Sequence, residues 1–235
     1  WGEYLLDHIR INPGTFYLPD PIPVEDVARW REHGLNFFTV AATRSCNPLH
    51  NDTCELDPAK PGLMNQTMAL IERLRPTIME LRKRGWMNMS SVYGFDESPP
   101  EATVGLRAVF GALKQAFPDL PTMTTSHTTL TQDYQLLRDA NIDLPIVWWG
   151  KMDKANITHC ESEGMRVTSY FADSPWQPEV NFRMDNSLLD GRLVLWQAFQ
   201  YNVSGWMYFM ADDFSDCCEA FPWPADKITG SCKFK

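Results

Sequence analysis

Two neighbouring carboxylates, Asp96 and Glu97, are the residues of this chain best placed to do chemistry. β-favouring residues precede the pair and Ser-Pro-Pro follows it, so the local order predicts a strand, an acidic tip and a helix. In parallel α/β folds the carboxyl ends of strands face the ligand, and a pair of carboxylates can transfer protons there. The alternative is a helix cap, because the helix dipole favours acids at a helix start without any catalysis.

Strand and helix patterns alternate along the 235 residues, which are 44% hydrophobic and can bury a sizeable core. Strands are predicted at 4–12, 36–41, 88–95, 120–126, 144–149, 165–171, 181–185 and 205–210. Helices are predicted at 24–33, 63–84, 101–117, 132–140, 152–163 and 187–201. We therefore expect a single α/β domain over 1–235, a (β/α)8 TIM-type barrel with an incomplete or replaced last helix. The competing doubly wound sheet lacks its Gly-x-Gly-x-x-Gly turn after the first strand.

In a barrel, the ends of the predicted strands would gather acids and aromatic rings around one mouth. Aromatic rings stack on the apolar faces of sugars, and paired carboxylates supply the proton transfer that glycosidic cleavage demands. We therefore expect a glycan substrate, although each aromatic taken alone is more typical of a core residue, so only the grouping counts. The candidate site residues are Arg10, Asn12, Tyr93, Asp96, Glu97, His127, Trp148, Trp149, Tyr170, Trp206 and Tyr208, with Asp212 nearby.

Other classes of function have weaker signals. The net charge of -9 disfavours a nucleic-acid partner or an anionic membrane surface, and no apolar run approaches membrane-spanning length. The five histidines form no His-Glu-x-x-His motif, and phosphate-binding and nucleophile-elbow motifs are absent, so neither a metal nor a cofactor is expected. Asp212, Asp213 and Asp216 could bind calcium, but a solvated acidic loop is the simpler interpretation.

Five Asn-x-Ser/Thr sequons favour a secreted or lumenal protein, since roughly one would arise by chance. They begin at Asn51, Asn65, Asn88, Asn156 and Asn202, and Asn88, inside a predicted strand, is not expected to carry a glycan. The six cysteines allow three disulfides: Cys46 and Cys54 suit a local bridge, and Cys217 and Cys218 suit distant partners, for instance Cys160 and Cys232. Without a start methionine or signal-like segment, the chain is expected to be a mature or excised segment.

The segment Tyr-Gly-Phe-Asp-Glu-Ser-Pro-Pro resembles the Tyr-x-x-Asp-Glu-Pro element of glycoside hydrolase family 123. The likeness continues in the C-terminal third, in the order Tyr170, Asn181, Asp185, Arg192, Trp196 and Gly205-Trp206-Met207-Tyr208. It covers most of the chain and implies a (β/α)8 barrel with retaining β-N-acetylgalactosaminidase activity, assisted by the substrate's 2-acetamido group and needing no metal. Ser169, Phe199 and Phe209 depart from the family's tryptophans, and the β-sandwich that often precedes its barrel is missing.

By this resemblance Asp96 would polarise the acetamido N–H, so that the acetamido carbonyl oxygen attacks the anomeric carbon. Glu97 would protonate the leaving oxygen and then activate water. Consecutive strand residues point to opposite faces, so both acids can share a site only where the backbone has left the strand. Two other functions stay open: a non-catalytic glycan-binding barrel, and a glycosidase with another sugar specificity. The oligomeric state is also open.

Overall fold

The computed structural model describes residues 2–16, 18, 20–43, 57–97, 102–126, 130–171, 178–182 and 187–208; the side chains of 126, 130–134 and 208 are not described. Within these ranges six strands form one parallel sheet in the order β1-β2-β3-β4-β5-β6. They are β1 Phe38–Ala42, β2 Ser90–Tyr93, β3 Thr122–Ser126, β4 Leu144–Trp148, β5 Thr168–Phe171 and β6 Gly205–Tyr208. Because the spatial order follows the sequence, the described strands form a barrel-type sheet rather than a doubly wound one.

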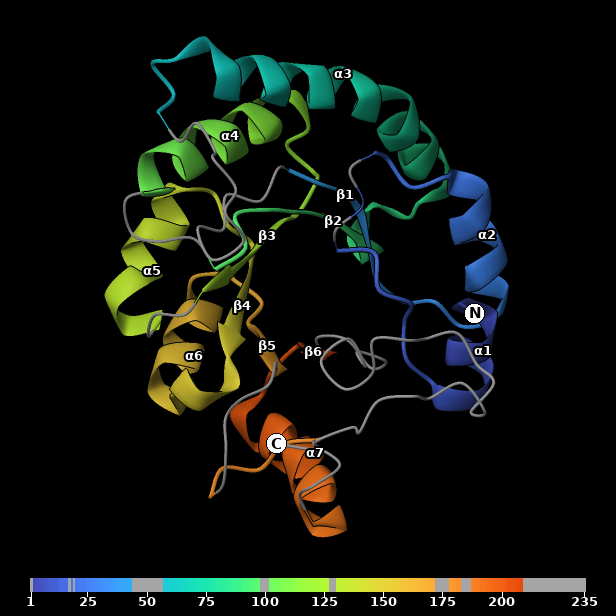
Figure 1. Cartoon of the computed structure of the whole chain (residues 1–235), viewed down its shortest axis with the longest axis vertical. Coiled ribbons are helices and arrows are strands. Elements are labelled where there is room, and N and C mark those ends of the chain that lie inside the picture. The colour runs from blue at the N-terminus through green and yellow to red at the C-terminus, as the bar shows by residue number, and fades with distance from the viewer. Residues whose placement is uncertain are drawn as a thin grey trace, which may run out of the picture.

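The helices alternate with these strands and cover the outer face of the curled sheet (Figure 1). The sheet therefore forms a partial (β/α) barrel, with six of the eight predicted strands present in the described residues. The helical elements are α1 Gly2–Tyr4, the π-helix η1 Leu5–Ile9, α2 Val24–Glu32, α3 Pro61–Arg84, η3 Met87–Met89, α4 Thr103–Ala116, α5 Leu130–Asp139, η5 Trp149–Lys151, α6 Lys154–Ser162 and α7 Leu188–Tyr201.

The helices follow from local signals. α3 begins with Pro61 in its first turn and ends before Gly85, whose φ of 70° suits the left-handed position after a helix. Its apolar residues recur at helical spacing and are buried against the sheet: Leu63, Leu70, Ile71, Leu74, Ile78 and Leu81. At α7, Ser187 and Asp190 form a reciprocal capping box.

Two apolar layers lie on opposite faces of the sheet. The outer layer packs strands against helices, with Val92, Phe95 and Phe110 among its fully or nearly fully buried members. A smaller inner layer, on the concave face, contains Tyr93, Met123, Leu144, Ile146 and Tyr170. Because side chains alternate along a strand, this division decides which residues lie inside the mouth.

The predicted first strand at 4–12 is wrong. Residues 2–9 form α1 and η1, and Arg10 ends η1 in a left-handed conformation with φ 64°. The short apolar run fitted both periodicities, and the alternating Ile9 and Ile11 are exposed rather than buried. Leu18 and Ile22 instead lie along the edge of β1, where the Ile22 N–H donates to the Val40 carbonyl at 2.7 Å. This contact protects an edge that a closed barrel would pair with another strand.

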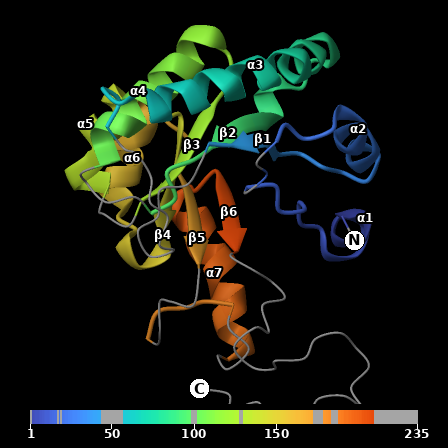
Figure 2. The same cartoon turned by 45° about the horizontal axis from the view of Figure 1, so that its top comes forward.

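The predicted short strand at 181–185 is absent from its described part, residues 181–182, and 183–185 lie outside the described residues. α7, which follows, lies beside β5 and β6 and extends away from the other helices (Figure 2). Its apolar side chains Leu188, Trp196 and Phe199 are exposed. None of the described helices has the length and apolar character needed to cross a membrane.

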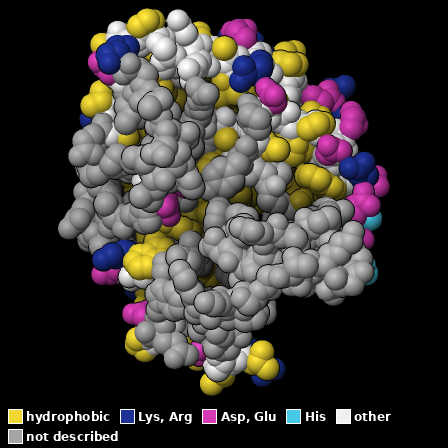
Figure 3. All heavy atoms as spheres, viewed as in Figure 1, with side chains coloured by type: hydrophobic (Ala, Val, Ile, Leu, Met, Phe, Trp, Pro, Cys, Tyr) yellow, Lys and Arg dark blue, Asp and Glu magenta, His cyan; other side chains and the backbone are white. Residues whose placement is uncertain are grey.

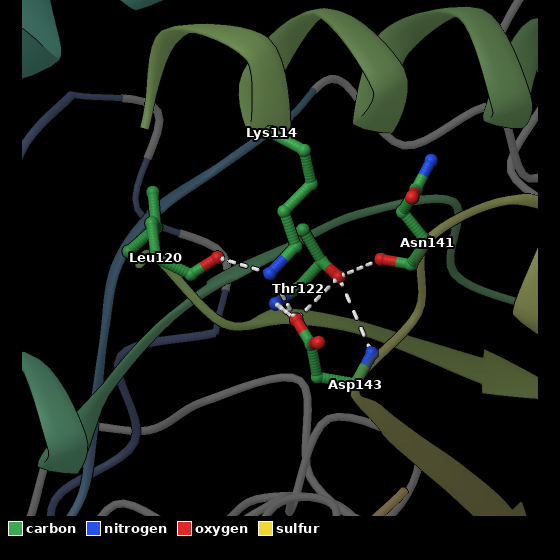
Figure 4. Close-up of polar contacts among 5 residues, drawn as sticks. All are labelled: Lys114, Leu120, Thr122, Asn141 and Asp143. Atoms are coloured by element: carbon green, nitrogen blue, oxygen red, sulfur yellow. Dashed lines mark hydrogen bonds and ion pairs between the residues drawn. The ribbon is translucent and has the colours of Figure 1, made fainter. Parts of the chain in front are cut away.

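Polar contacts at the N-terminal ends of β3 and β4 join successive β/α units (Figure 4). Lys114 of α4 contacts Asp143 Oδ2 at 2.6 Å, and the backbone N–H of Thr122 donates to the same oxygen at 2.8 Å. Thr122 Oγ1 donates to the Asn141 carbonyl. The N-terminal face of a barrel is where such contacts serve stability.

On the surface over α2 and α3, Lys and Arg side chains are interspersed with Asp and Glu side chains (Figure 3).

Candidate active site

Asp96 and Glu97 lie in a turn directly after β2, at the C-terminal end of the sheet. Phe95 has a φ of 57° and Glu97 a φ of 47°. The left-handed region is unfavourable for both residue types and costs about 1–3 kcal/mol at each. Such strain persists only where surrounding contacts impose it, and it is typical of functional sites. The backbone has thus left the strand at the position where two adjacent acids could share one site.

Glycine at position 94 allows β1 to approach this turn closely. A Cβ at Gly94 would lie 1.6 Å from Thr43 Oγ1. Any other residue at position 94 would therefore force Thr43 or the turn itself to move. The Thr43 N–H donates to the Tyr93 carbonyl at 2.7 Å, and the Gly94 N–H donates to the Met123 carbonyl at 3.1 Å. The strands on both sides therefore fix the start of the turn.

Two hydroxyl groups hold the carboxylate of Asp96, whose residue is only 8% exposed. Tyr93 Oη donates to Asp96 Oδ1 at 2.5 Å, and Thr125 Oγ1 donates to the same oxygen at 2.6 Å. Tyr93 comes from β2 and Thr125 from β3, so the contact crosses between strands. Donors aimed at a buried oxygen compensate the cost of taking a carboxylate out of water.

Glu97 is half-buried and is contacted both from the neighbouring strand β3 and, across the concave face, from β5. The Tyr170 hydroxyl, on β5, donates to Glu97 Oε1, and the Glu97 N–H donates to Thr125 Oγ1 at 2.8 Å. Tyr93 and Tyr170 belong to the same inner apolar layer. Their hydroxyls hold Asp96 and Glu97 respectively, so the two acids lie above one concave surface. The arrangement offers two carboxyl groups, several hydroxyl donors and apolar ring surface at one mouth.

The predicted aromatic residues divide between the two faces of the sheet. Trp148 packs with the inner layer, next to Tyr170, its partner in the β4–β5 register. Trp149 begins η5 and lies in an outer cluster with Trp206, at 4.5 Å between ring centroids. Trp206 also packs on Phe171, at 4.6 Å. Consecutive residues of an extended chain point oppositely, so the structure places Trp148 in the inner layer beside Tyr170 and places Trp149 and Trp206 in the outer cluster.

The remaining candidates do not join the acids within the described residues. Asn12 exchanges hydrogen bonds with Asn36, which precedes β1 at the opposite end of the sheet, with a distance of 2.8 Å from Asn12 Nδ2 to Asn36 Oδ1. Arg10 is exposed at the end of η1. These two positions follow from the wrong assignment of a strand to 4–12. His127 and Asp212 lie outside the described residues, and of Tyr208 only the backbone, at the end of β6, is described.

Two expectations about processing need correction. Cys160 is a free, fully buried thiol, which contradicts its suggested disulfide, and burial raises its pKa to about 11. Asn88 is exposed in η3 rather than buried in a strand. The other five cysteines, and the calcium candidates Asp212, Asp213 and Asp216, lie outside the described residues. In the part of the chain that the structure describes, no cluster of His, Cys, Asp or Glu could hold a metal ion.

Sequence reasoning missed Thr125, which contacts both acidic residues. The available signal was the run Thr-Met-Thr-Thr-Ser in β3, a strand with hydroxyl groups close to its carboxyl end. β-branched threonine is common in strands because its side chain packs well on a pleated surface, so the run carried no sign of its role.

One of the solved structures that resemble this chain supports the fold. No protein-family model and no curated protein matches the sequence. A family 123 glycoside hydrolase from Clostridium perfringens aligns with a TM-score of 0.56 at 13% identity, over 80% of this chain and 35% of that chain. A β-D-glucuronidase from Dictyoglomus thermophilum aligns with a TM-score of 0.46 at 11% identity, over 80% and 36%. A chain from Silicibacter pomeroyi DSS-3, provisionally named a glycerophosphoryl diester phosphodiesterase, aligns with 0.41 at 16% identity, over 73% and 46%.

This chain spans less than half the length of each of these three structures. At such identities a structural likeness reports the fold alone, and a fold hosts many chemistries. The described chain thus shares the partial (β/α) barrel fold of a solved glycoside hydrolase.

Proposed function

We propose that this chain is a retaining glycoside hydrolase that removes terminal β-linked N-acetylhexosamine, with N-acetylgalactosamine as the favoured sugar. The observation that carries the proposal is the strained turn that holds Asp96 and Glu97 side by side above the inner apolar layer. The resemblance of Tyr93–Pro100 to the family 123 element supports the choice of sugar.

In the first step the 2-acetamido carbonyl oxygen of the substrate attacks the anomeric carbon, and the bond to the leaving oxygen breaks. Asp96, held by Tyr93 and Thr125, accepts the acetamido N–H and orients the carbonyl for attack. Glu97 gives its proton to the leaving oxygen. The acetamido proton stays on nitrogen, so the product of this step is an N-protonated oxazoline fused to the sugar, whose positive charge the Asp96 carboxylate balances.

In the second step water adds to the anomeric carbon of the oxazoline and Glu97 takes the water's proton. The carbon–oxygen bond of the oxazoline breaks, and the acetamido group is restored. Two inversions at the anomeric carbon give net retention. Tyr170, whose hydroxyl donates to Glu97 Oε1, orients the carboxyl group through both proton transfers.

The test compares Glu97→Gln and Asp96→Asn on aryl 2-acetamido-2-deoxy-β-galactosides with good and poor phenol leaving groups. Glu97→Gln should lose on the order of 10³-fold in kcat with a poor leaving group and much less with a good one, because a good leaving group needs no proton. Asp96→Asn should lose about 10³-fold with both, because the oxazoline must form in each case. Aryl glycosides without the 2-acetamido group should not be cleaved.

Unaltered rates in both variants would contradict the proposal. Wild-type protein that binds N-acetylgalactosamine in a calorimetric titration but releases no phenol would contradict hydrolysis and support the glycan-binding barrel instead. Cleavage of the gluco epimer at a higher kcat/KM would change the sugar and keep the mechanism.

A further inference from the structure

Thr125 joins the two acidic residues to the neighbouring strand. It lies on β3, is 4% exposed, and its Oγ1 is 2.6 Å from Asp96 Oδ1 and 2.8 Å from the Glu97 backbone nitrogen. A single hydroxyl group therefore contacts the side chain of one acid and the backbone of the other.

The three oxygens of Tyr93, Thr125 and Asp96 fix where the hydroxyl protons point. Each hydroxyl lies 2.5–2.6 Å from Asp96 Oδ1, whereas the two hydroxyl oxygens are 3.0 Å apart. Each hydroxyl proton therefore points to Asp96 Oδ1 rather than to the other hydroxyl, because one carboxylate oxygen can accept both. Thr125 then has a lone pair left for the Glu97 N–H. Loss of this hydroxyl would remove a donor from Asp96 and leave the Glu97 N–H without this acceptor.

The second contact falls on a strained residue. Glu97 has a φ of 47°, and the bond from its N–H to Thr125 Oγ1 holds the backbone in that conformation. Thr124, the preceding residue of β3, contacts the other left-handed residue of the turn. Its Oγ1 donates to the Phe95 carbonyl at 3.0 Å. Two successive threonines of β3 therefore hold both strained positions.

We propose that Thr125 is a positioning residue that sets the relative orientation of the Asp96 and Glu97 carboxyl groups. The inference rests on the proposed function for its kinetic consequence, but the geometry it describes does not depend on the substrate. A misplacement of about 1 Å at catalytic groups can cost about 10²-fold in rate. The effect belongs in kcat, because Thr125 orients the reacting groups.

The experiment compares Thr125→Val, which keeps the shape and removes the hydroxyl, with Thr125→Ser, which keeps the hydroxyl. We expect Thr125→Val to lower kcat on an aryl 2-acetamido-β-galactoside about 10²-fold with KM changed less than about threefold. Thr125→Ser should stay within about fivefold of the wild type. The matched control is Thr168→Val, because Thr168 is also a buried strand threonine, and its Oγ1 donates to the Pro145 carbonyl at 3.1 Å. Its kcat should be unchanged.

Crystal structures of the same variants give a measurement that needs no substrate. In Thr125→Val, the backbone of Glu97 should leave its left-handed conformation, or the Glu97 carboxyl group should move by about 1 Å. Thr125→Ser and Thr168→Val should keep the wild-type turn. An active Thr125→Val with wild-type kcat and an unmoved turn would overturn the positioning role alone. A wild type that cleaves no aryl glycoside would overturn the proposed function, and the turn in the Thr125→Val crystal would still decide the role of Thr125.

Discussion

The two ends of β3 each bind a carboxylate, and they do so with different partners. At its N-terminal end, Thr122 contacts Asp143, which also pairs with the Lys114 ammonium. At its C-terminal end, Thr125 contacts Asp96, which also accepts a hydrogen bond from the Tyr93 hydroxyl. The Lys114 ammonium offsets the charge of Asp143, whereas the two hydroxyl groups hold Asp96 through donated hydrogen bonds.

Backbone strain also differs between the two ends of β3, and it is greater at the C-terminal end. Asn141, beside the Lys114–Asp143 contact, has a φ of 60°, and asparagine adopts this conformation at low cost. Phe95 and Glu97 have similar φ values, and for them the cost is higher. The N-terminal end thus uses a residue suited to its conformation, and the C-terminal end does not. The difference suggests that one end is built for stability and the other for function.

The largest expected effect separates activity at the two ends. Asp96→Asn should reduce kcat on an aryl 2-acetamido-β-galactoside about 10³-fold, while Asp143→Asn should leave the kcat of the folded protein within about twofold. Steady-state kinetics on both variants, normalised to the folded fraction from circular dichroism, measure this. Equal losses in the two variants would remove the distinction between the ends.

Stability should show the opposite order. Asp143→Ala should lower the free energy of unfolding by about 2 kcal/mol, because it removes acceptors from the Thr122 N–H and from Lys114. Asp96→Asn should change it by less than about 1 kcal/mol, since an amide oxygen still accepts from both hydroxyls. Urea denaturation measures both values. A larger loss at Asp96 would mean that its contacts serve the fold.

Release of strain gives a smaller effect. Glu97→Gly should be about 1 kcal/mol more stable than Glu97→Gln, because glycine adopts a positive φ without steric cost. Asn141→Gly should change stability by only a few tenths of a kcal/mol. Thermal unfolding of the three variants tests this, and equal stability of the two Glu97 variants would argue against strain at the turn.

The smallest expected effect concerns pH at the N-terminal end, where Arg82 pairs with Asp119 through two hydrogen bonds. The hydrogen bond from Arg82 lowers the pKa of Asp119. The pair therefore adds stability above the ordinary carboxyl pKa of about 3.9 and loses it as the pH falls through the lower folded-state value. Both side chains are partly exposed, so wild type should exceed Asp119→Asn by less than about 1 kcal/mol at pH 7. Urea denaturation between pH 7 and 3 should show this gap closing, and a gap that widens in acid would contradict the pairing.

The helices and inner strands could be predicted from sequence where their patterns were long. α3 and α4 match predicted helices closely, because many residues repeat the same spacing, and in α3 Pro61 and Gly85 also mark the two ends. The segment 4–12 was too short for its period to be decided, and the placement of Arg10 and Asn12 failed with it. The division of Trp148 from Trp149 depended on where β4 ends, a boundary that sequence patterns locate only approximately.

The sequence alone determined that two adjacent acids follow a strand and precede a helix, because spacing and capping are properties of neighbouring residues. Only the tertiary structure decided that Thr125 would contact both acids and that Tyr170, 73 positions away, would reach Glu97. Those contacts depend on which strands lie side by side and on which face each side chain points to. Neither property is encoded within a short stretch of sequence, since both are set by the packing of the whole sheet.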